Sequence, residues 1–160
     1  MKVQDVMTKD VKFCSPNTNL AEASEMLWSD SCGTLPVVDN RANVVGMITD
    51  RDICIALGTR DAKASMTTVR QVSLPKLFSC APQDDIHAAL ETMGAQKIRR
   101  LPVIDERGTL KGILSIDDVV LHASKTRSVL SDLSYEDVVD TLKAICERTT
   151  EAAAVALAHP

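Results

Sequence analysis

"LPVVDNRANVVGMITDRDI", residues 35–53, is written a second time in this chain as "LPVIDERGTLKGILSIDDV", residues 101–119. Working outward from this pair, residues 3–57 align with residues 69–123 without a gap, at a constant offset of 66 positions (101 − 35). A constant register over such a length indicates that one structural unit has been duplicated. The sequence therefore predicts four segments: repeat 1 (3–57), a polar linker (58–68), repeat 2 (69–123) and a tail (124–160).

Each repeat is expected to contain, in order, a strand, a helix, two strands and a second helix. Apolar side chains at helical spacing predict the first helix over 18–30 and again in repeat 2, with Thr18 and Asp84 as N-caps. Turn-forming residues between two apolar runs predict a hairpin, after which Asp50 and Ile116 begin the second helix. The fold class is thus α+β: two repeats packed through their sheets with pseudo-two-fold symmetry, sharing one core, plus a C-terminal helix.

The tail carries its own helix signal. "SYED" at 134–137 has the spacing of a capping box, in which a Ser and an acidic residue satisfy each other's backbone N–H groups. An amphipathic stripe follows, which suits packing on another helix of this chain or on a partner's helix, and both options stay open. The stripe comprises Val138, Leu142, Ile145, Thr149, Ala152 and Ala156.

Composition limits the class of protein. The chain has 160 residues, 45% of them hydrophobic and 25% charged, which is typical of a globular protein. A net charge of −4 argues against a general nucleic-acid binder. No apolar run approaches the roughly 18 residues that span a bilayer, and no signal peptide is evident. We therefore expect a cytoplasmic protein that binds neither nucleic acid nor membrane.

The five cysteines are odd in number and lack any Cys-x-x-Cys pair. Small buried hydrophobes in a reducing compartment are the favoured interpretation, with a zinc site or a regulatory disulfide as alternatives.

The cluster at residues 49–52 is open to three interpretations. A metal site would need converging oxygens, but Asp50 is matched by Ile116 in the second copy. Catalysis would need a histidine or cysteine with a partner at catalytic spacing, and neither that nor a glycine-rich phosphate loop is found. We therefore expect no metal site and no enzymatic activity.

The third interpretation is ligand binding by the repeated pattern Gly-x-x-Thr/Ser-x-x-Asp. A hydroxyl at a helix N-terminus, where free N–H groups point outward, favours phosphate. An Asp one turn later can accept both hydroxyls of a ribose, and an apolar neighbour can contact a base. The alternative is that the same residues merely cap their helices. The candidates are Thr49, Asp52 and Met47 in repeat 1, and Ser115, Asp118 and Ile113 in repeat 2.

These residues resemble two CBS domains, the cystathionine-β-synthase motif, arranged as a tandem Bateman pair of the stand-alone bacterial type. The resemblance covers about residues 3–123 and implies that adenosine compounds bind in clefts between the repeats. It implies that Thr49 and Ser115 contact phosphate, that Asp52 and Asp118 hold ribose, and that Arg51 contacts phosphate.

"KIRRLPVID" at 97–105 is similar to a phosphate-binding segment of the gamma subunit of AMP-activated protein kinase. Arg99 and Arg100 are thus phosphate candidates, with a solvated basic run as the alternative; Lys12 and Phe78 lie where the family places adenine contacts.

The two copies differ in charge. Arg51 is matched by Asp117, while Arg99 and Arg100 are matched by Gly33 and Thr34. Asp117 would repel a phosphate. Unequal affinities of the two clefts follow, although the sequence leaves open which cleft receives which arginine.

The resemblance implies a regulatory module that senses AMP, ADP or ATP, with NAD or S-adenosylmethionine as rival ligands, and needs no metal. It further implies a homodimer that signals to an unidentified downstream protein. A structural adaptor with vestigial clefts, and a redox role for the cysteines, are the alternatives.

Overall fold

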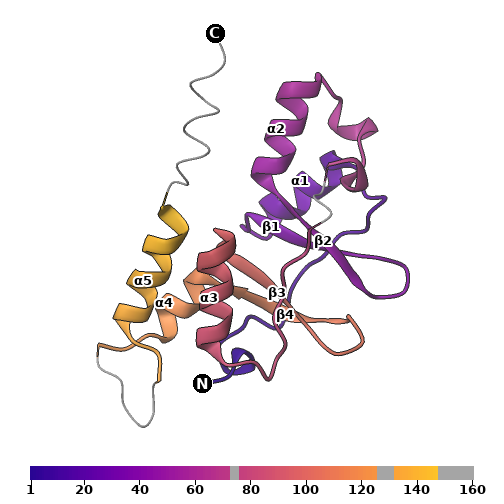
Figure 1. Ribbon diagram of the computed structural model, residues 1–160. Helices are drawn as coiled ribbons and strands as arrows, with labels where there is room; N and C mark the ends of the chain where they lie inside the picture. The colour runs from indigo at the N-terminus through magenta and orange to yellow at the C-terminus, as the bar shows by residue number, and fades with distance from the viewer. Residues whose placement is uncertain (73–75, 126–131, 148–160) are drawn as a thin grey trace.

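A computed structural model of the chain describes residues 1–72, 76–125 and 132–147. It confirms an α+β fold with two small antiparallel sheets and a C-terminal helix (Figure 1). The elements are η1 (Val3–Asp5), α1 (Leu20–Ser29), β1 (Thr34–Val38), β2 (Val44–Thr49), α2 (Asp50–Arg60), η2 (Ala64–Met66), η3 (Val69–Gln71), α3 (Ile86–Gln96), β3 (Arg100–Ile104), β4 (Leu110–Ser115), α4 (Ile116–His122) and α5 (Tyr135–Cys146).

The two hairpins are built to the same plan. In the first, Thr34 pairs with Thr49, and in the second, Arg100 pairs with Ser115. Both ladders shift register near their outer ends, between Val37 and Val38 and at the matching residues of β3. The predicted hairpins are therefore confirmed, with the repeat register preserved in the pairing.

The first strand expected in each repeat is reduced to a single bridge. Cys14 pairs in parallel with Val37, and Cys80 pairs with Val103. A proline lacks the N–H that a ladder needs, and one follows each cysteine by two residues, so pairing stops there.

The predicted caps of the first helices were wrong by one residue. Asn19 and Asp85, not Thr18 and Asp84, are the N-caps of α1 and α3. The Thr18 hydroxyl instead accepts a hydrogen bond from the Ser15 N–H, which shapes the turn before α1. By contrast, α2 and α4 begin at Asp50 and Ile116 as predicted, although α2 runs on to Arg60, into the predicted linker.

The segment that leads into each repeat pairs with the other repeat. At the N-terminus of the chain, Val3 N–H donates to Asp84 O at 3.0 Å, and Ile86 N–H donates to Met1 O at 3.0 Å. The matching bonds in the other half join residues 67–70 to residues 16–20 at 2.9 Å. Figure 1 shows the N-terminus beside α3, away from the α1 and α2 helices that follow it in sequence. Each repeat therefore supplies the entry segment of the other.

The hydrophobic interior consists of two clusters rather than the single shared core that the sequence suggested. The fully buried Val3 and the buried Val6 belong to the cluster built mainly from repeat 2. The fully buried Val69 belongs to the cluster of repeat 1. Because each hairpin packs on its own helices, apolar burial is completed within each repeat and its borrowed segment.

Helix α5 folds back on repeat 2. The Ser134–Asp137 capping box predicted from the sequence is present, and Val138 is buried in the repeat 2 cluster. Leu142 and Ile145 pack against that cluster. Packing within the chain is thus the observed option for α5, while Thr149, Ala152 and Ala156 lie outside the described residues. No helix in the described part of the chain is both long and apolar enough to cross a membrane.

The exchanged segments predict that a mutation in one repeat loosens the other. Val3→Ala should destabilise the protein by about 2 kcal/mol, since two buried methyl groups are removed. Hydrogen exchange should speed up chiefly in α3 and β3. The matched variant Val69→Ala should speed up exchange in α1 and β1 instead. Faster exchange in α1 after Val3→Ala, with α3 unaffected, would contradict the exchange of segments.

Candidate functional site

Two clefts lie on either side of Thr34 and Arg100, the matched first residues of β1 and β3. Both of these residues line both clefts. One cleft contains the Thr49 motif and has a volume of about 630 Å³, and the other contains the Ser115 motif and measures about 520 Å³. Cavities of this size at the junction of two units suit a small molecule.

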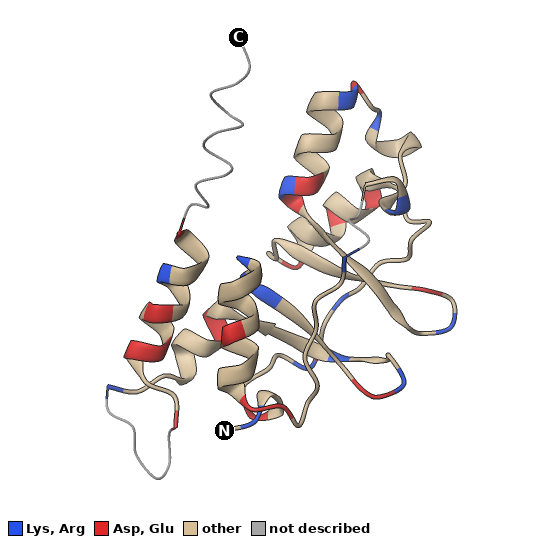
Figure 2. Cartoon of the chain, in the orientation of Figure 1, with Lys and Arg blue, Asp and Glu red and all other residues tan. Residues whose placement is uncertain are grey.

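The first cleft, called here the basic cleft, collects most of the residues that the sequence singled out. Five basic and two acidic side chains line it. Figure 2 shows the blue end of α3 and start of β3 opposite the first turn of α2. Its lining comprises Thr34, Met47, Thr49, Asp50, Arg51, Asp52, Lys76, Phe78, Lys97, Ile98, Arg99, Arg100 and Ile145.

Packing thereby answers the question that the sequence left open, because Arg51, Arg99 and Arg100 all line the same cleft. Two cations of this cleft, Lys76 and Lys97, were not predicted. Lys76 lies two residues before Phe78, and Lys97 lies two residues before Arg99. The positive charge of the residues that flank the predicted positions could have indicated both lysines. Lys76 Nζ lies 4.7 Å from the ring centre of Phe78.

The second cleft, called here the acidic cleft, collects the remaining candidates. Two basic and four acidic side chains line it. Its lining comprises Thr8, Asp10, Val11, Lys12, Asp30, Ser31, Cys32, Thr34, Arg100, Ile113, Ser115, Asp117 and Asp118.

Both cations of the acidic cleft have a carboxylate beside them. Lys12 Nζ is 3.6 Å from Asp30, and an Arg100 guanidinium nitrogen is 3.9 Å from Asp117. The positive charge available there to an anion is reduced accordingly.

The motif residues cap their helices, as the structural alternative proposed. The Asp52 Oδ2 accepts hydrogen bonds from the Thr49 N–H at 3.0 Å and from the Thr49 hydroxyl at 2.6 Å. Ser115 and Asp118 repeat these bonds at 2.8 and 2.6 Å. These capping bonds do not use the second oxygen of each Asp, Oδ1. In Asp118 that oxygen accepts a bond from the Thr8 hydroxyl at 3.0 Å.

Gly112 allows the entry segment to approach the sheet. A Cβ at this position would lie 2.5 Å from the Thr8 carbonyl oxygen, and Thr8 and Ile113 exchange backbone hydrogen bonds at 3.0 and 2.9 Å. Only glycine admits a backbone this close. The glycine of the motif in repeat 2 therefore serves the close approach of another backbone segment.

Lys97 connects the basic cleft to α5. This residue ends α3 in a left-handed conformation (φ 57°), and its Nζ donates to the carbonyls of Ala144 at 3.1 Å and Glu147 at 2.5 Å. These carbonyls lie at the C-terminal end of α5, where a cation is favourable. Ile145 of the same helix lines the cleft. The floor of the basic cleft is therefore partly built by the tail.

Two of the five cysteines are buried, two are exposed, and Cys32 is half-buried. Burial raises the pKa of the Cys14 thiol to about 11 and that of Cys80 to about 12. A thiol with a raised pKa is protonated at neutral pH and is a poor nucleophile. Cys54 and Cys146 are exposed, and all five side chains are free thiols. The two matched cysteines thus fit the predicted role of small core residues.

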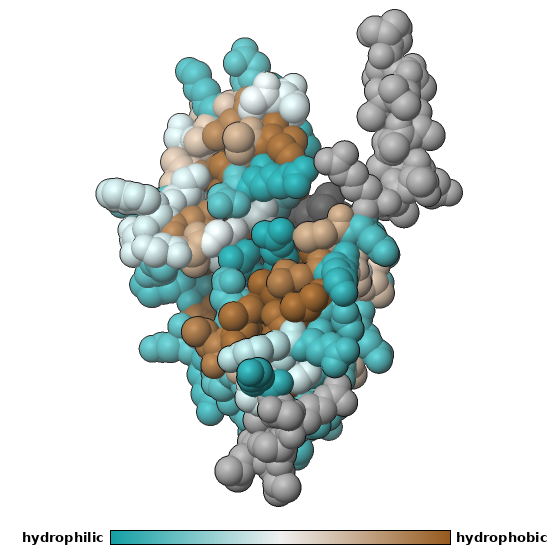
Figure 3. Space-filling model, turned by 90° about the vertical axis from the view of Figure 1, so that its left-hand side faces the viewer, coloured by the Kyte–Doolittle hydropathy of each residue, from teal (hydrophilic) through white to brown (hydrophobic). Residues whose placement is uncertain are grey.

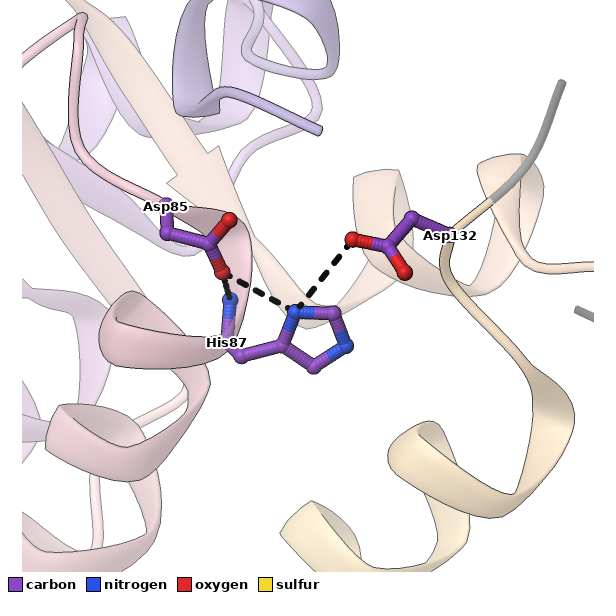
Figure 4. Close-up of side chains that lie close together, drawn as sticks. All are labelled: Asp85, His87 and Asp132. Atoms are coloured by element: carbon purple, nitrogen blue, oxygen red, sulfur yellow. Dashed lines mark hydrogen bonds and ion pairs between the residues drawn. The ribbon is translucent and has the colours of Figure 1, made fainter. Parts of the chain in front are cut away.

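One group among the described residues has the composition of a metal site, at the start of α3. Ligand atoms of Asp85, His87 and Asp132 all lie within 4.8 Å of one another (Figure 4). Asp85 accepts bonds from the backbone N–H of His87 and pairs with its ring Nδ1, both at 2.9 Å. The backbone bond is the main reason that the pKa of Asp85 lies below its usual range. Helix capping and ion pairing explain this cluster without a cation.

Comparison with known proteins identifies the family. The sequence-family model of the CBS domain matches residues 3–59 and again residues 69–125. The chain belongs to the CBS domain family. A CBS domain-containing protein of Bacillus subtilis, YhcV, is 31% identical over 139 residues, covering 85% of this chain and 97% of the relative.

Solved CBS domain pairs share the fold. CBSX2, determined in complex with AMP, is 28% identical with a TM-score of 0.66, covering 75% of this chain and 93% of that one. The CBS domain pair of MJ0100, determined with 5′-methylthioadenosine and S-adenosyl-L-methionine, is 23% identical with a TM-score of 0.69. It covers 76% of this chain and 94% of that chain. The recognition of a tandem CBS pair from the repeated motif is confirmed.

The capping boxes predict a stability effect that must be separated from ligand binding. Asp52→Ala should lower the free energy of unfolding by about 1 kcal/mol, because two bonds to the start of α2 are lost. Asp118→Ala should lower it further, because the Thr8 bond is lost as well. Urea unfolding measures both.

Asp117→Ala is the matched control, since this side chain lies in the same helical turn but is 76% exposed. It should change stability by a few tenths of a kcal/mol. A loss as large as that of Asp118→Ala would show that the cap is not the cause.

Proposed function

We propose that this protein is a regulatory module that binds an adenosine nucleotide, AMP, ADP or ATP, in the basic cleft. One observation carries the proposal: the fold brings Arg99 and Arg100 of repeat 2 to the same cleft as Arg51 and the Thr49–Asp52 motif of repeat 1. Guanidinium groups match phosphate oxygens in geometry and charge.

The other walls of the basic cleft suit the rest of a nucleotide. Met47 and Phe78 provide apolar surface for a purine, while Asp52 provides a carboxylate for the ribose hydroxyls. The Thr49 hydroxyl and the start of α2 suit a phosphate. The relative CBSX2, which binds AMP, supports the class of ligand.

The signal would leave the cleft through α5. Lys97 holds the last carbonyls of α5 and also lines the cleft, so a phosphate would compete with those carbonyls for the same ammonium group. Binding would therefore loosen the end of α5. A module of this kind needs no metal and no catalytic residue of its own, and its output passes to a downstream protein.

A homodimer completes the proposal. Large apolar side chains are exposed on matched helices, including Ile55 of α2 at 48% and its counterpart Leu121 of α4 at 81%. Figure 3 shows hydrophobic areas on both halves of one face of the molecule, separated by hydrophilic surface. Burial of such areas between two copies would be favourable.

NAD and S-adenosylmethionine remain rival ligands because both contain the adenosine that the motif suits. A structural adaptor with vestigial clefts is the alternative function. It predicts that loss of the tail abolishes partner binding while cleft variants have no effect.

Arginine substitutions test nucleotide binding. Arg51→Ala and Arg99→Ala should each weaken AMP binding about tenfold, the loss of one charged hydrogen-bonding partner. Titration calorimetry of the full chain with AMP, ADP, ATP and NAD measures this. Arg41→Ala, on the exposed turn between β1 and β2, should leave the affinity unchanged. Failure of every adenosine compound to bind the folded protein would overturn the proposal.

Lys97→Met tests the route to the tail. In the wild-type chain, AMP should speed up hydrogen exchange at the end of α5. Without AMP, Lys97→Met should already exchange about tenfold faster there, because two hydrogen bonds are gone, and AMP should add little. Lys111→Met, on β4, is the matched control and should behave as wild type. No response of α5 to bound AMP would exclude this route.

A further inference from the structure

The two clefts are matched at most of their lining positions, so their differences can be compared directly. Each has a Thr or Ser at the helix start, an Asp one turn later and an apolar side chain from the preceding strand. Each also receives the loop that follows the exchanged entry segment. A ligand that fits the shape of one cleft therefore meets equivalent groups in the other.

The clefts differ in charge, and at most of the matched positions where they differ the basic cleft has the more positive residue. Three cations of the basic cleft are matched in the acidic cleft by an acid or a neutral residue: Arg51 by Asp117, Lys76 by Asp10, and Lys97 by Ser31. A fourth cation, Arg99, corresponds in the repeat to Gly33, which does not line the acidic cleft. Two positions run the other way. Phe78 is matched by Lys12, whose charge is offset by Asp30 at 3.6 Å, and Asp50 of the basic cleft corresponds to the neutral Ile116.

The remaining cation of the acidic cleft, Arg100, is shared with the basic cleft and paired with Asp117. By contrast, Arg51 and Arg99 form no ion pair with any of the described residues. The charge at the matched position 51 or 117 is thus of opposite sign, and the basic cleft as a whole has five basic and two acidic side chains against two basic and four acidic in the acidic cleft. A phosphate is attracted by Arg51 in one cleft and repelled by Asp117 in the other.

We infer that the pair selects its two ligands by charge, and that position 51 or 117 sets the choice. The basic cleft takes a phosphorylated adenosine. The acidic cleft takes an adenosine compound that carries no phosphate and whose 5′ substituent is uncharged or cationic. This inference rests on the proposed function, because it assumes that adenosine is what the shared shape of the clefts accepts.

The chemistry of the acidic cleft supports this class of ligand. Ile113 offers the same kind of apolar surface as Met47, and the Ser115–Asp118 pair repeats the ribose-side geometry. Asp117 is 76% exposed at the first turn of α4, so it can approach a cation without displacing a buried partner. Asp10 and Asp30 add negative charge to the same cavity.

Calorimetry on the full chain tests the assignment with AMP and S-adenosylmethionine as probes. Wild type should bind one AMP per chain. After saturation with AMP, one S-adenosylmethionine per chain should still bind with its affinity unchanged. Binding of two AMP molecules per chain with similar affinity, or competition between the two compounds for one site, would overturn the inference while leaving the proposed function intact.

The second part of the test reverses the charge at position 117, the counterpart of Arg51. Asp117→Arg should raise the AMP stoichiometry from one to two and weaken S-adenosylmethionine binding at least tenfold. Asp117→Asn, which keeps the shape and preserves folding, should weaken S-adenosylmethionine binding several-fold without creating an AMP site. Glu106→Arg, on the turn between β3 and β4, makes the same change in net charge and should alter neither.

Three results would reject position 117 as the determinant: unchanged binding in both Asp117 variants, an effect of Glu106→Arg equal to that of Asp117→Arg, or loss of AMP from the basic cleft in Asp117→Asn. If no adenosine compound binds wild type at all, the proposed function fails and the inference falls with it. The two failures are thereby distinguishable.

Discussion

The exchange of entry segments is the constraint on which the rest of the molecule depends. Each repeat completes its core with a valine from ahead of the other repeat, Val3 in one case and Val69 in the other. Neither repeat can therefore bury its apolar surface fully without its neighbour. Because the exchange is reciprocal, the two hairpins are held side by side, and the clefts open along their junction with Arg100 between them.

The same exchange builds part of a cleft. The entry segment carries Thr8 across to repeat 2, where its carbonyl lies over Gly112 and its hydroxyl donates to Asp118. The Asp118 side chain thus caps α4, binds the exchanged entry segment through Thr8, and is also the candidate contact for ribose. The capping bonds are common to Asp52 and Asp118, and the Asp of the motif is present in both copies, whereas the exposed neighbour Asp117 does not match Arg51.

The two repeats have the same backbone geometry but differ in the charge of the side chains that line their clefts. The backbone geometry of the two halves is the same, down to the register of both hairpins and the irregularity near their outer ends. Exposed side chains that face the clefts, such as Arg51 and Asp117, take no part in strand pairing or in the capping bonds. They can acquire opposite charges without loss of fold, and this is how one architecture can offer two chemically different cavities.

Much of this protein was determined by its sequence. The constant register of the repeat predicted the α+β class, the two hairpins and the starts of α2 and α4, and the Ser-x-x-acid spacing in the tail predicted the α5 capping box. These predictions succeeded because local periodicity and cap chemistry act over a few residues. The helix starts at Asn19 and Asp85 were missed because Thr18 and Asp84, one residue earlier, are equally good caps and bond to local turns instead.

Contacts between distant segments were decided only by the tertiary structure. The repeat pattern could not show that residues 1–6 pack on repeat 2, since an apolar residue suits either core. Nor could it assign Arg51 and Arg99 to one cleft, or place Lys97 between that cleft and α5. The sequence specifies which side chains are charged. Which of these charges line the same cavity is decided only by the packing of the two repeats, because that packing joins residues far apart in the chain.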